Sequence, residues 1–263
     1  MKHDTPLRRS IEIQIRVIGA LLMREIITRY GRHNVGFVWL FGEPMMFTLG
    51  VIGLWTATKT VHGSGLPIAA FALSGYSSVL LWRNCVNRCC LAILPNHSLL
   101  FHRNVRVIDL FISRAILEIA GATISIFTLT ILFVTLGIMS MPSNISLILM
   151  GWFLLAFFAI GLGFAIGALS ERSEMSERIW HTVSYLLFAL SGALFMVDWL
   201  PKKMQQYVLF LPMVHGVEMM RAGYFGDLVK PHYSVSYVVV FDAILMLVGL
   251  FLVAETGKRV EPE

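Results

Sequence analysis

The longest stretch without a charged side chain most constrains the fold of this chain. From Ile119 to Ser170, 52 residues pass without Asp, Glu, Lys or Arg. A helix needs about 20 apolar residues to cross a bilayer, so this stretch can cross twice, with a turn at residues 141–144. Over the 263 residues, 57% are hydrophobic and 14% are charged, against about 25% charged in a soluble protein. We therefore predict an all-α integral membrane protein, and exclude a soluble enzyme, a nucleic-acid binder and a secreted disulfide scaffold.

Apolar runs of transmembrane length occur six times. The predicted spans cover residues 36–58, 67–94, 110–138, 145–169, 179–197 and 234–254. Sixteen of the 21 Lys and Arg residues lie in the N-terminal arm, near the connection between the second and third spans, in the loop 171–178 or in the tail. Because basic loops stay in the cytoplasm, both termini are predicted to be cytoplasmic. Residues 1–263 form a single transmembrane domain, with the spans within 36–254 and a tail at 255–263.

The N-terminal arm, residues 1–34, is predicted to be an amphipathic helix in the cytoplasmic interface. Thr5-Pro6 is a typical helix start. Apolar residues then recur at helical spacing: Ile11, Ile15, Ile18, Leu22 and Ile26. Two charge pairs lie four residues apart: Glu12 with Arg16, and Glu25 with Arg29. An apolar stripe with a cationic opposite face favours a helix on the membrane surface, and a soluble helix packed on a partner is the alternative.

A second segment that does not span is residues 198–231, on the outer side. It is too polar to cross, yet it contains Trp199, Tyr207 and several apolar residues. Pro201 can start a short helix and Pro212 interrupts it. We predict a re-entrant helical hairpin between spans five and six that acts as an outer gate, with a simple surface loop as the alternative.

Motifs of catalysis are missing from the sequence. It has no P-loop, no G-x-S-x-G elbow and no H-E-x-x-H. The cysteines, Cys85, Cys89 and Cys90, are clustered in one apolar segment without nearby histidines, so we interpret them as packing residues. Gly163-x-x-x-Gly167 indicates close helix packing. We predict a chain that is not an enzyme and that binds no cofactor or metal itself.

One face of the predicted fifth span combines aromatic rings with hydroxyls. Its residues are His181, Ser184, Tyr185, Phe188, Ser191 and Phe195. Sugars have apolar ring faces and many hydroxyls, so this mixture favours a wet wall along a substrate path. Hydrogen bonding between helices is the alternative. Other polar residues in the spans have simpler interpretations: Arg83, Asn84, Asn87 and Arg88 can extend toward the cytoplasm, and Asp242 can pair with a neighbour.

Three stretches of the sequence are distinctive. The first is residues 21–31 (LLMREIITRYG), followed by 36–40 (GFVWL) and Glu43-Pro44. The second is residues 101–109 (FHRNVRVID) with Arg114 and Glu118, and the third is residues 212–221 (PMVHGVEMMR). All three resemble the polysaccharide-exporting ABC permeases, and most closely the inner-membrane permease of group 2 capsule export. The family often has proline before the Ile-Asp pair, where this chain has Val107.

The resemblance implies a type 2 ABC exporter subunit in the bacterial inner membrane. The arm would be a gate helix, about residues 96–109 a coupling helix, and about residues 201–221 an outer gate. ATPase coupling would involve Arg24, Glu25, Arg29, Tyr30, His102, Arg103, Arg106 and Asp109. The outer gate would involve Trp199, Pro201, Tyr207, Pro212, His215, Glu218 and Arg221.

The resemblance also implies partners. These are a second copy of the chain, an ABC ATPase dimer that holds ATP and Mg, a periplasmic polysaccharide co-polymerase, an outer-membrane exporter and a glycolipid-linked acidic polysaccharide within membrane lipid. Arg8, Arg9 and Arg16 lie where such a polymer would approach, although positive-inside topology alone also explains them. The alternatives are a permease for O-antigen, teichoic acid or a drug and, from other classes, an integral membrane enzyme or a scaffold.

Overall fold

The computed structural model describes residues 6–30, 35–58, 65–100 and 105–260. Within these ranges no residue lies in a β-strand, which confirms the all-α prediction. The long helices are α1 (Pro6–Tyr30), α2 (Val35–Thr58), α3 (Ile68–Cys89), α4 (Val107–Thr135), α5 (Ile145–Arg172), α6 (Glu174–Leu190) and α9 (Val235–Val260). The shorter ones are α7 (Lys202–Val208) and α8 (Pro212–Phe225), with 3-10 turns η1 (Leu94–Leu99), η2 (Val197–Trp199) and η3 (Gly226–Leu228).

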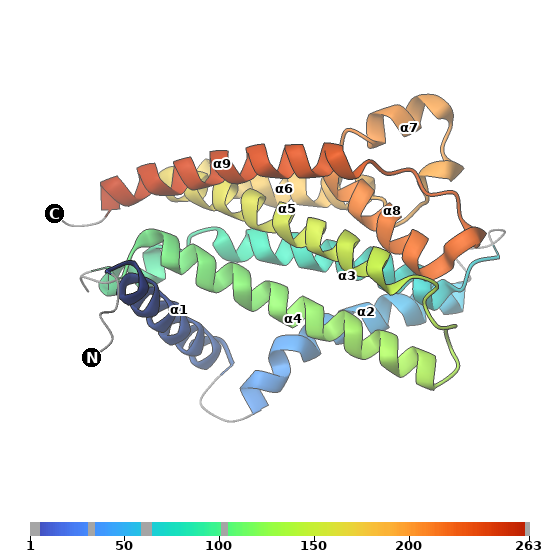
Figure 1. The fold of residues 1–263 in the computed structure, drawn as a ribbon, viewed down its shortest axis with the longest axis horizontal. Helices are drawn as coiled ribbons and strands as arrows, with labels where there is room; N and C mark the ends of the chain where they lie inside the picture. The colour runs from blue at the N-terminus through green and yellow to red at the C-terminus, as the bar shows by residue number, and fades with distance from the viewer. Residues whose placement is uncertain (1–5, 31–34, 59–64, 101–104, 261–263) are drawn as a thin grey trace.

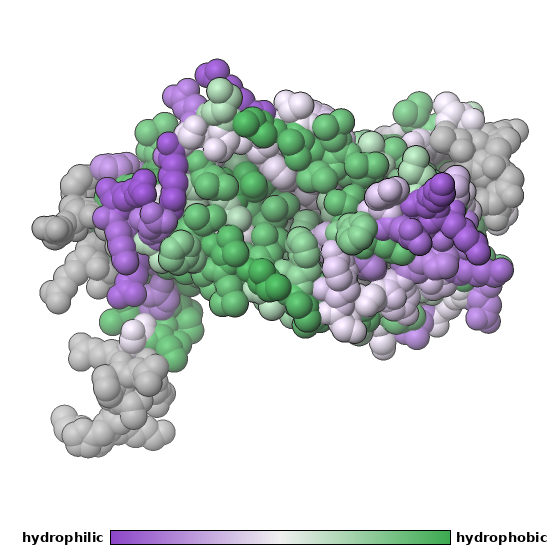
Figure 2. All heavy atoms as spheres, turned by 90° about the horizontal axis from the view of Figure 1, so that it is seen from above, coloured by the Kyte–Doolittle hydropathy of each residue, from purple (hydrophilic) through white to green (hydrophobic). Residues whose placement is uncertain are grey.

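The helices form an elongated bundle with α5 at its centre (Figure 1). Helix α5 packs against α3, α8 and α9, and α4 packs against α3. Both termini, α1 and η1 lie toward one end of the bundle, while α7 and α8 lie toward the other (Figure 1). Figure 2 shows an apolar belt between two polar ends, which is the surface expected of a bundle that crosses a bilayer.

Four helices of the described residues are long and apolar enough to cross a membrane. They are Val38–Thr58 of α2, Val107–Thr135, Ile145–Arg172 and Val235–Val260. Four of the six predicted crossings are therefore supported by length and composition. Helices α3 and α6 correspond to the second and fifth predicted spans. Because α3 carries Arg83 and Arg88 and α6 has 17 residues, length and composition alone do not identify these two helices as spans.

The prediction that the fifth span ends at residue 197 is wrong. Helix α6 stops at Leu190, and Gly192 adopts φ of +80°, a left-handed conformation that commonly terminates a helix after its last turn. Ser191 is the C-cap and Phe195 lies in the following loop. These two residues therefore do not continue the helical face that the sequence pattern predicts.

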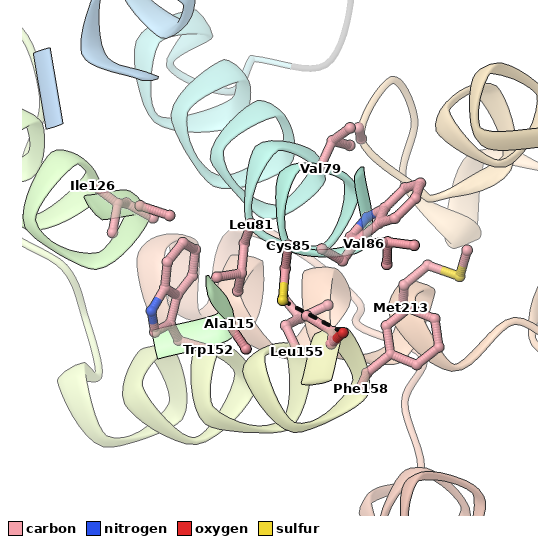
Figure 3. Packing of buried hydrophobic residues seen from close by; sticks show 14 of the residues in the cluster. Val79, Leu81, Cys85, Val86, Ala115, Ile126, Trp152, Leu155, Phe158 and Met213 are labelled. Atoms are coloured by element: carbon pink, nitrogen blue, oxygen red, sulfur yellow. Dashed lines mark hydrogen bonds between the residues drawn. The ribbon is translucent and has the colours of Figure 1, made fainter. Parts of the chain in front are cut away.

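The core is built around close approaches of α5 to its neighbours. A Cβ on Gly167 would lie 2.6 Å from the Cys89 carbonyl oxygen and 2.5 Å from a ring carbon of Phe111, so the predicted close packing is confirmed. Figure 3 shows the Cys85 side chain of α3 reaching α5, where its Sγ lies 3.6 Å from the Ala159 carbonyl oxygen. The three cysteines are free and buried, in agreement with a packing role.

Candidate functional site

A polar stripe runs along one side of α3. Its residues are Tyr76, Arg83, Asn84, Asn87 and Arg88, and they are half-buried. They stand at positions i, i+7, i+8, i+11 and i+12, which lie on one face of an α-helix. The other side chains of α3 beyond its first residue are buried in the bundle. We call these five residues the α3 stripe.

Helix α6 borders the α3 stripe with aromatic rings. The guanidinium carbon of Arg83 lies 4.2 Å from the ring centroid of Tyr185, a cation–π contact. Phe188 meets Tyr76 edge-on, with ring centroids 6.3 Å apart. Tyr185 is 61% exposed, so the stripe and its aromatic border face outward from this chain.

The remaining residues of the predicted fifth-span face divide between two environments. His181 is exposed, and its Nε2 lies 3.7 Å from a carboxylate oxygen of Glu177. Ser184 and Ser191 are fully buried, and their hydroxyls donate to the carbonyls of His181 and Phe188 within their own segment. The structure therefore places Tyr185, Phe188 and His181 on the accessible side, but not the two serines.

An ion-pair cluster joins α1, α2, α3 and α4 at one end of the stripe. Arg29 of α1 pairs with Glu118 of α4 and, at 3.1 Å, with Glu43 of α2. The Nε of Arg88, on α3, lies 3.3 Å from the same Glu118 carboxylate. Glu118 is almost completely buried, and two arginines compensate for the two carboxylates. Such a network is costly to break because it would leave a buried charge without a partner.

Further contacts connect α1 to the region predicted to couple with an ATPase. Arg24 donates to the side-chain oxygen of Asn96 in η1, and Glu25 pairs with Arg114 of α4 at 3.2 Å. The predicted pair between Glu25 and Arg29 is thus replaced by partners from other helices. Arg16 keeps the predicted local pair, with its guanidinium 3.9 Å from Glu12.

Asp109 is the buried anchor at the start of α4. Its carboxylate accepts the Arg106 backbone N–H at 2.9 Å and a hydrogen bond from Gln14 of α1. Asp109 therefore fixes the helix start and the position of α1. His102 and Arg103 lie outside the described residues, as do the side chains of Arg8, Arg9 and Tyr30.

At the opposite end, Arg221 of α8 organises the loop after α6. Its guanidinium donates to the carbonyls of Gly192 at 2.6 Å, Ala193 at 2.7 Å and Phe195 at 2.5 Å. It also lies over the Phe71 ring at 3.8 Å. The Arg221 side chain is completely buried. Through it, α8 donates hydrogen bonds to carbonyls that would accept backbone N–H groups if α6 were longer.

Glu218 and His215, on the same helix, attach two more segments. The Glu218 carboxylate accepts the backbone N–H groups of Val197 at 3.1 Å and His232 at 3.0 Å. His215 accepts the Ser234 N–H at Nδ1, and its Nε2 lies 2.8 Å from a backbone carbonyl oxygen. Burial lowers the pKa of His215, which favours the neutral ring that these two contacts require.

We call Arg221, Glu218 and His215 the Arg221 site. The other predicted gate residues lie on η2, on α7 or just before it, and at the start of α8. Trp199 stacks on Phe71, with ring centroids 5.4 Å apart. Pro201 immediately precedes α7 and Pro212 begins α8, so the two short helices start where the prolines predict. Tyr207 on α7 is 70% exposed.

The chain matches a family model along most of its length. Residues 16–225 match the model described as "ABC-2 type transporter". The chain belongs to the ABC-2 type transporter family. In this transporter chain the match begins in α1 and ends at the last residue of α8, so it includes the α3 stripe, the ion-pair cluster and the Arg221 site.

Curated relatives match over nearly the whole transporter chain. Capsule polysaccharide export inner-membrane protein CtrC of Neisseria meningitidis serogroup B is 47% identical over 99% of this chain and 98% of its own length. Capsule polysaccharide export inner-membrane protein BexB of Haemophilus influenzae is 44% identical over 99% and 98%. Polysialic acid transport protein KpsM of Escherichia coli is 27% identical over 93% and 95%. The family resemblance in the three sequence stretches is thereby confirmed.

Sequence reasoning did not bring together the residues of the ion-pair cluster. In the sequence, Glu43 and Glu118 belong to separate stretches of the family resemblance, and the interpretation of Asn84, Asn87 and Arg88 is only that they extend toward the cytoplasm. The spacing of Asn84, Asn87 and Arg88 is the one sequence signal for this site, because it places polar residues on one side of an otherwise apolar helix.

Proposed function

We propose that this chain is the membrane permease of an ATP-driven exporter of capsular polysaccharide, in the bacterial inner membrane with both termini in the cytoplasm. The observation that carries this proposal is the match to relatives named for capsule polysaccharide export, over 98–99% of both lengths. The distribution of basic residues supports the orientation.

The path for the polymer is proposed to lie between two copies of the chain. The α3 stripe faces outward, and a bilayer would not tolerate it without polar neighbours or water. Helices α2 and α6 border α3, and α2 is the least buried of the four apolar candidate spans, with 17% of its apolar stretch buried against 44% for α4 and α5. A second copy would enclose the stripe and cover these helices.

The side chains on this path suit a sugar polymer. Asn84 and Asn87 offer hydrogen bonds to hydroxyls. Tyr76, Tyr185 and Phe188 offer aromatic faces to the apolar sides of sugar rings. Weak, repeated contacts of this kind allow a long chain to advance without a single tight binding site.

ATP hydrolysis is proposed to occur on a separate ABC ATPase dimer, which holds ATP and Mg. The docking surface would comprise η1 and the start of α4. The hydrogen bond from Arg24 to Asn96 and the pair between Glu25 and Arg114 would transmit movement of that surface to α1. A periplasmic co-polymerase and an outer-membrane exporter would continue the path beyond the Arg221 site.

The proposal is tested by deleting the gene in a capsulated host. We expect loss of surface glycan staining and polymer trapped in the cytoplasm, both restored by the wild-type gene. Complementation with Tyr185→Ala and Phe188→Ala should restore export only in part, whereas Leu186→Ala, at a neighbouring exposed position, should restore it fully. Normal surface glycan in the deletion strain would reject the proposed function, and copurifying O-antigen or teichoic acid would assign a different polymer.

A further inference from the structure

A polar cavity lies where α1, α2 and α3 meet. Its volume is about 200 Å³, and it is lined by Arg29, Glu43, Asn84, Asn87 and Arg88. The cavity opens beside the α3 stripe, and Asn84, Asn87 and Arg88 belong to both. Polar groups at this depth of a helix bundle are expensive and commonly mark a binding site or pathway.

The cavity has more hydrogen-bond donors than its surroundings use. Arg88 directs its Nε toward Glu118 at 3.3 Å, while its two Nη nitrogens have no acceptor among the residues that the structure describes. The Asn84 amide also lacks a partner within the same ranges. Asn87 accepts the Trp180 indole N–H at 2.8 Å through Oδ1, so its Nδ2 is directed away from the indole.

The carboxylates of the cavity are already engaged. Glu43 pairs with Arg29 at 3.1 Å. Glu118, which contacts the cavity's arginines but does not line the cavity, is shared by Arg29 and Arg88. Apart from the Asn84 Oδ1, the groups that remain available are N–H donors, and those of Arg88 belong to a guanidinium that is 43% exposed. A ligand with acceptor oxygens complements these donors, and a negative charge on the ligand would face the Arg88 guanidinium, whose carboxylate partner Glu118 is shared with Arg29.

We propose that this cavity binds one acidic sugar unit of the exported polymer. The Arg88 guanidinium faces the carboxylate or phosphate of that unit, because its planar donors match the geometry of both groups. The amides of Asn84 and Asn87 face ring hydroxyls. This inference rests on the proposed function and gives the polymer a specific contact where it enters the α3 stripe.

The test measures binding to the full-length chain in phosphatidylcholine nanodiscs by saturation-transfer difference NMR. The probes are trigalacturonic acid and galactose 6-phosphate, with galactotriose and inorganic phosphate as comparisons. We expect both acidic sugars to bind, galactotriose to bind at least tenfold more weakly, and inorganic phosphate to compete poorly. Arg88→Gln should weaken binding of the acidic sugars by about tenfold, the usual order for a lost hydrogen bond to a charged group.

Two further variants separate recognition from folding. Asn84→Leu removes donors without breaking a contact of the described structure, so weaker binding with an unchanged size-exclusion profile supports the proposal. Arg178→Gln removes the same charge from an exposed helical pair with Glu174, at 3.4 Å, and should bind like the wild type.

Equal binding of the neutral and acidic probes, or unchanged binding in Arg88→Gln and Asn84→Leu, would overturn the inference. So would inorganic phosphate that competes as well as the acidic sugars. These results would leave the proposed function standing, because that function is judged by surface glycan in the deletion strain.

Discussion

Replacing Arg221 by methionine should strongly destabilise the outer end of the bundle. The substitution keeps a long side chain but removes three hydrogen bonds, of 2.5 to 2.7 Å, to the carbonyls of Gly192, Ala193 and Phe195. It also removes the contact with the Phe71 ring. Hydrogen bonds to a charged group contribute about 1.5–3 kcal/mol each, and the cation–π contact about 2 kcal/mol when desolvated.

These contributions do not simply add, because methionine also avoids the desolvation cost of the guanidinium, which is several kcal/mol. The Arg221 variant does, however, leave three buried carbonyls without their donors. The net loss should then resemble that of a broken buried ionic contact, about 3–5 kcal/mol. At about 2–4 °C per kcal/mol for a chain of this size, the unfolding temperature should fall by about 10 °C.

The assay is thermal unfolding of the full-length chain in detergent, followed by fluorescence-detected size exclusion. Lys203→Met is the matched control, since Lys203 lies on the exposed α7 and should leave the unfolding temperature unchanged. A second perturbation addresses the same contact from the other side. In Gly75→Ala the new Cβ would lie 2.5 Å from the Ala193 carbonyl oxygen and 2.9 Å from an Arg221 nitrogen, so the unfolding temperature should also fall. Unfolding of Arg221→Met within about 1 °C of the wild type would refute this reasoning.

Three other substitutions, the first with a matched control, give expected outcomes in the same thermal assay. Gly167→Ala should cost about 1–3 kcal/mol through its clash with α3, whereas Gly50→Ala, with no atom within 4 Å of the new Cβ, should be neutral or slightly stabilising. Asp242→Leu should raise the unfolding temperature, because both carboxylate oxygens are buried without a hydrogen-bond partner among the described residues; a lower temperature would contradict this. Glu118→Gln should lower it and should also expose α1 to limited proteolysis, since one carboxylate holds both Arg29 and Arg88; unchanged proteolysis would show that α1 is held by other contacts.

The sequence predicts best those helices whose limits depend on their own residues. Helices α4 and α5 lie within or beside the uncharged stretch, and Asn144 begins α5 by accepting the Leu147 N–H at 3.1 Å. Pro201 and Pro212 likewise mark the starts of α7 and α8 by local chemistry. These features need no knowledge of a distant partner, and the predicted positions agree with the structure within a few residues.

The failures arise where a distant residue decides the local structure. Helix α6 ends early because Gly192 turns left-handed and Arg221, 29 residues away, donates to its carbonyl. Spacing alone assigns Arg29 to Glu25, but the structure gives it carboxylates from α2 and α4. A periodic pattern shows which residues share a face, and it contains no information on which helix will cover that face.

The two kinds of contact in this bundle suggest which parts are fixed and which can move. Helix α5 approaches its neighbours through glycine: a Cβ on Gly151 would lie 2.8 Å from the Gly216 carbonyl oxygen of α8, and one on Gly249 of α9 would lie 2.8 Å from that of Gly161. Backbones packed this closely cannot separate or slide without losing many dispersion contacts. Helix α1 buries Leu21 in the core but is otherwise held by long polar side chains, whose pairs can lengthen or exchange partners. In the proposed exporter, driven from the end where α1 meets η1 and α4, movement of α1 against a rigid α5 core would therefore act directly on the cavity and on the proposed entrance to the α3 stripe.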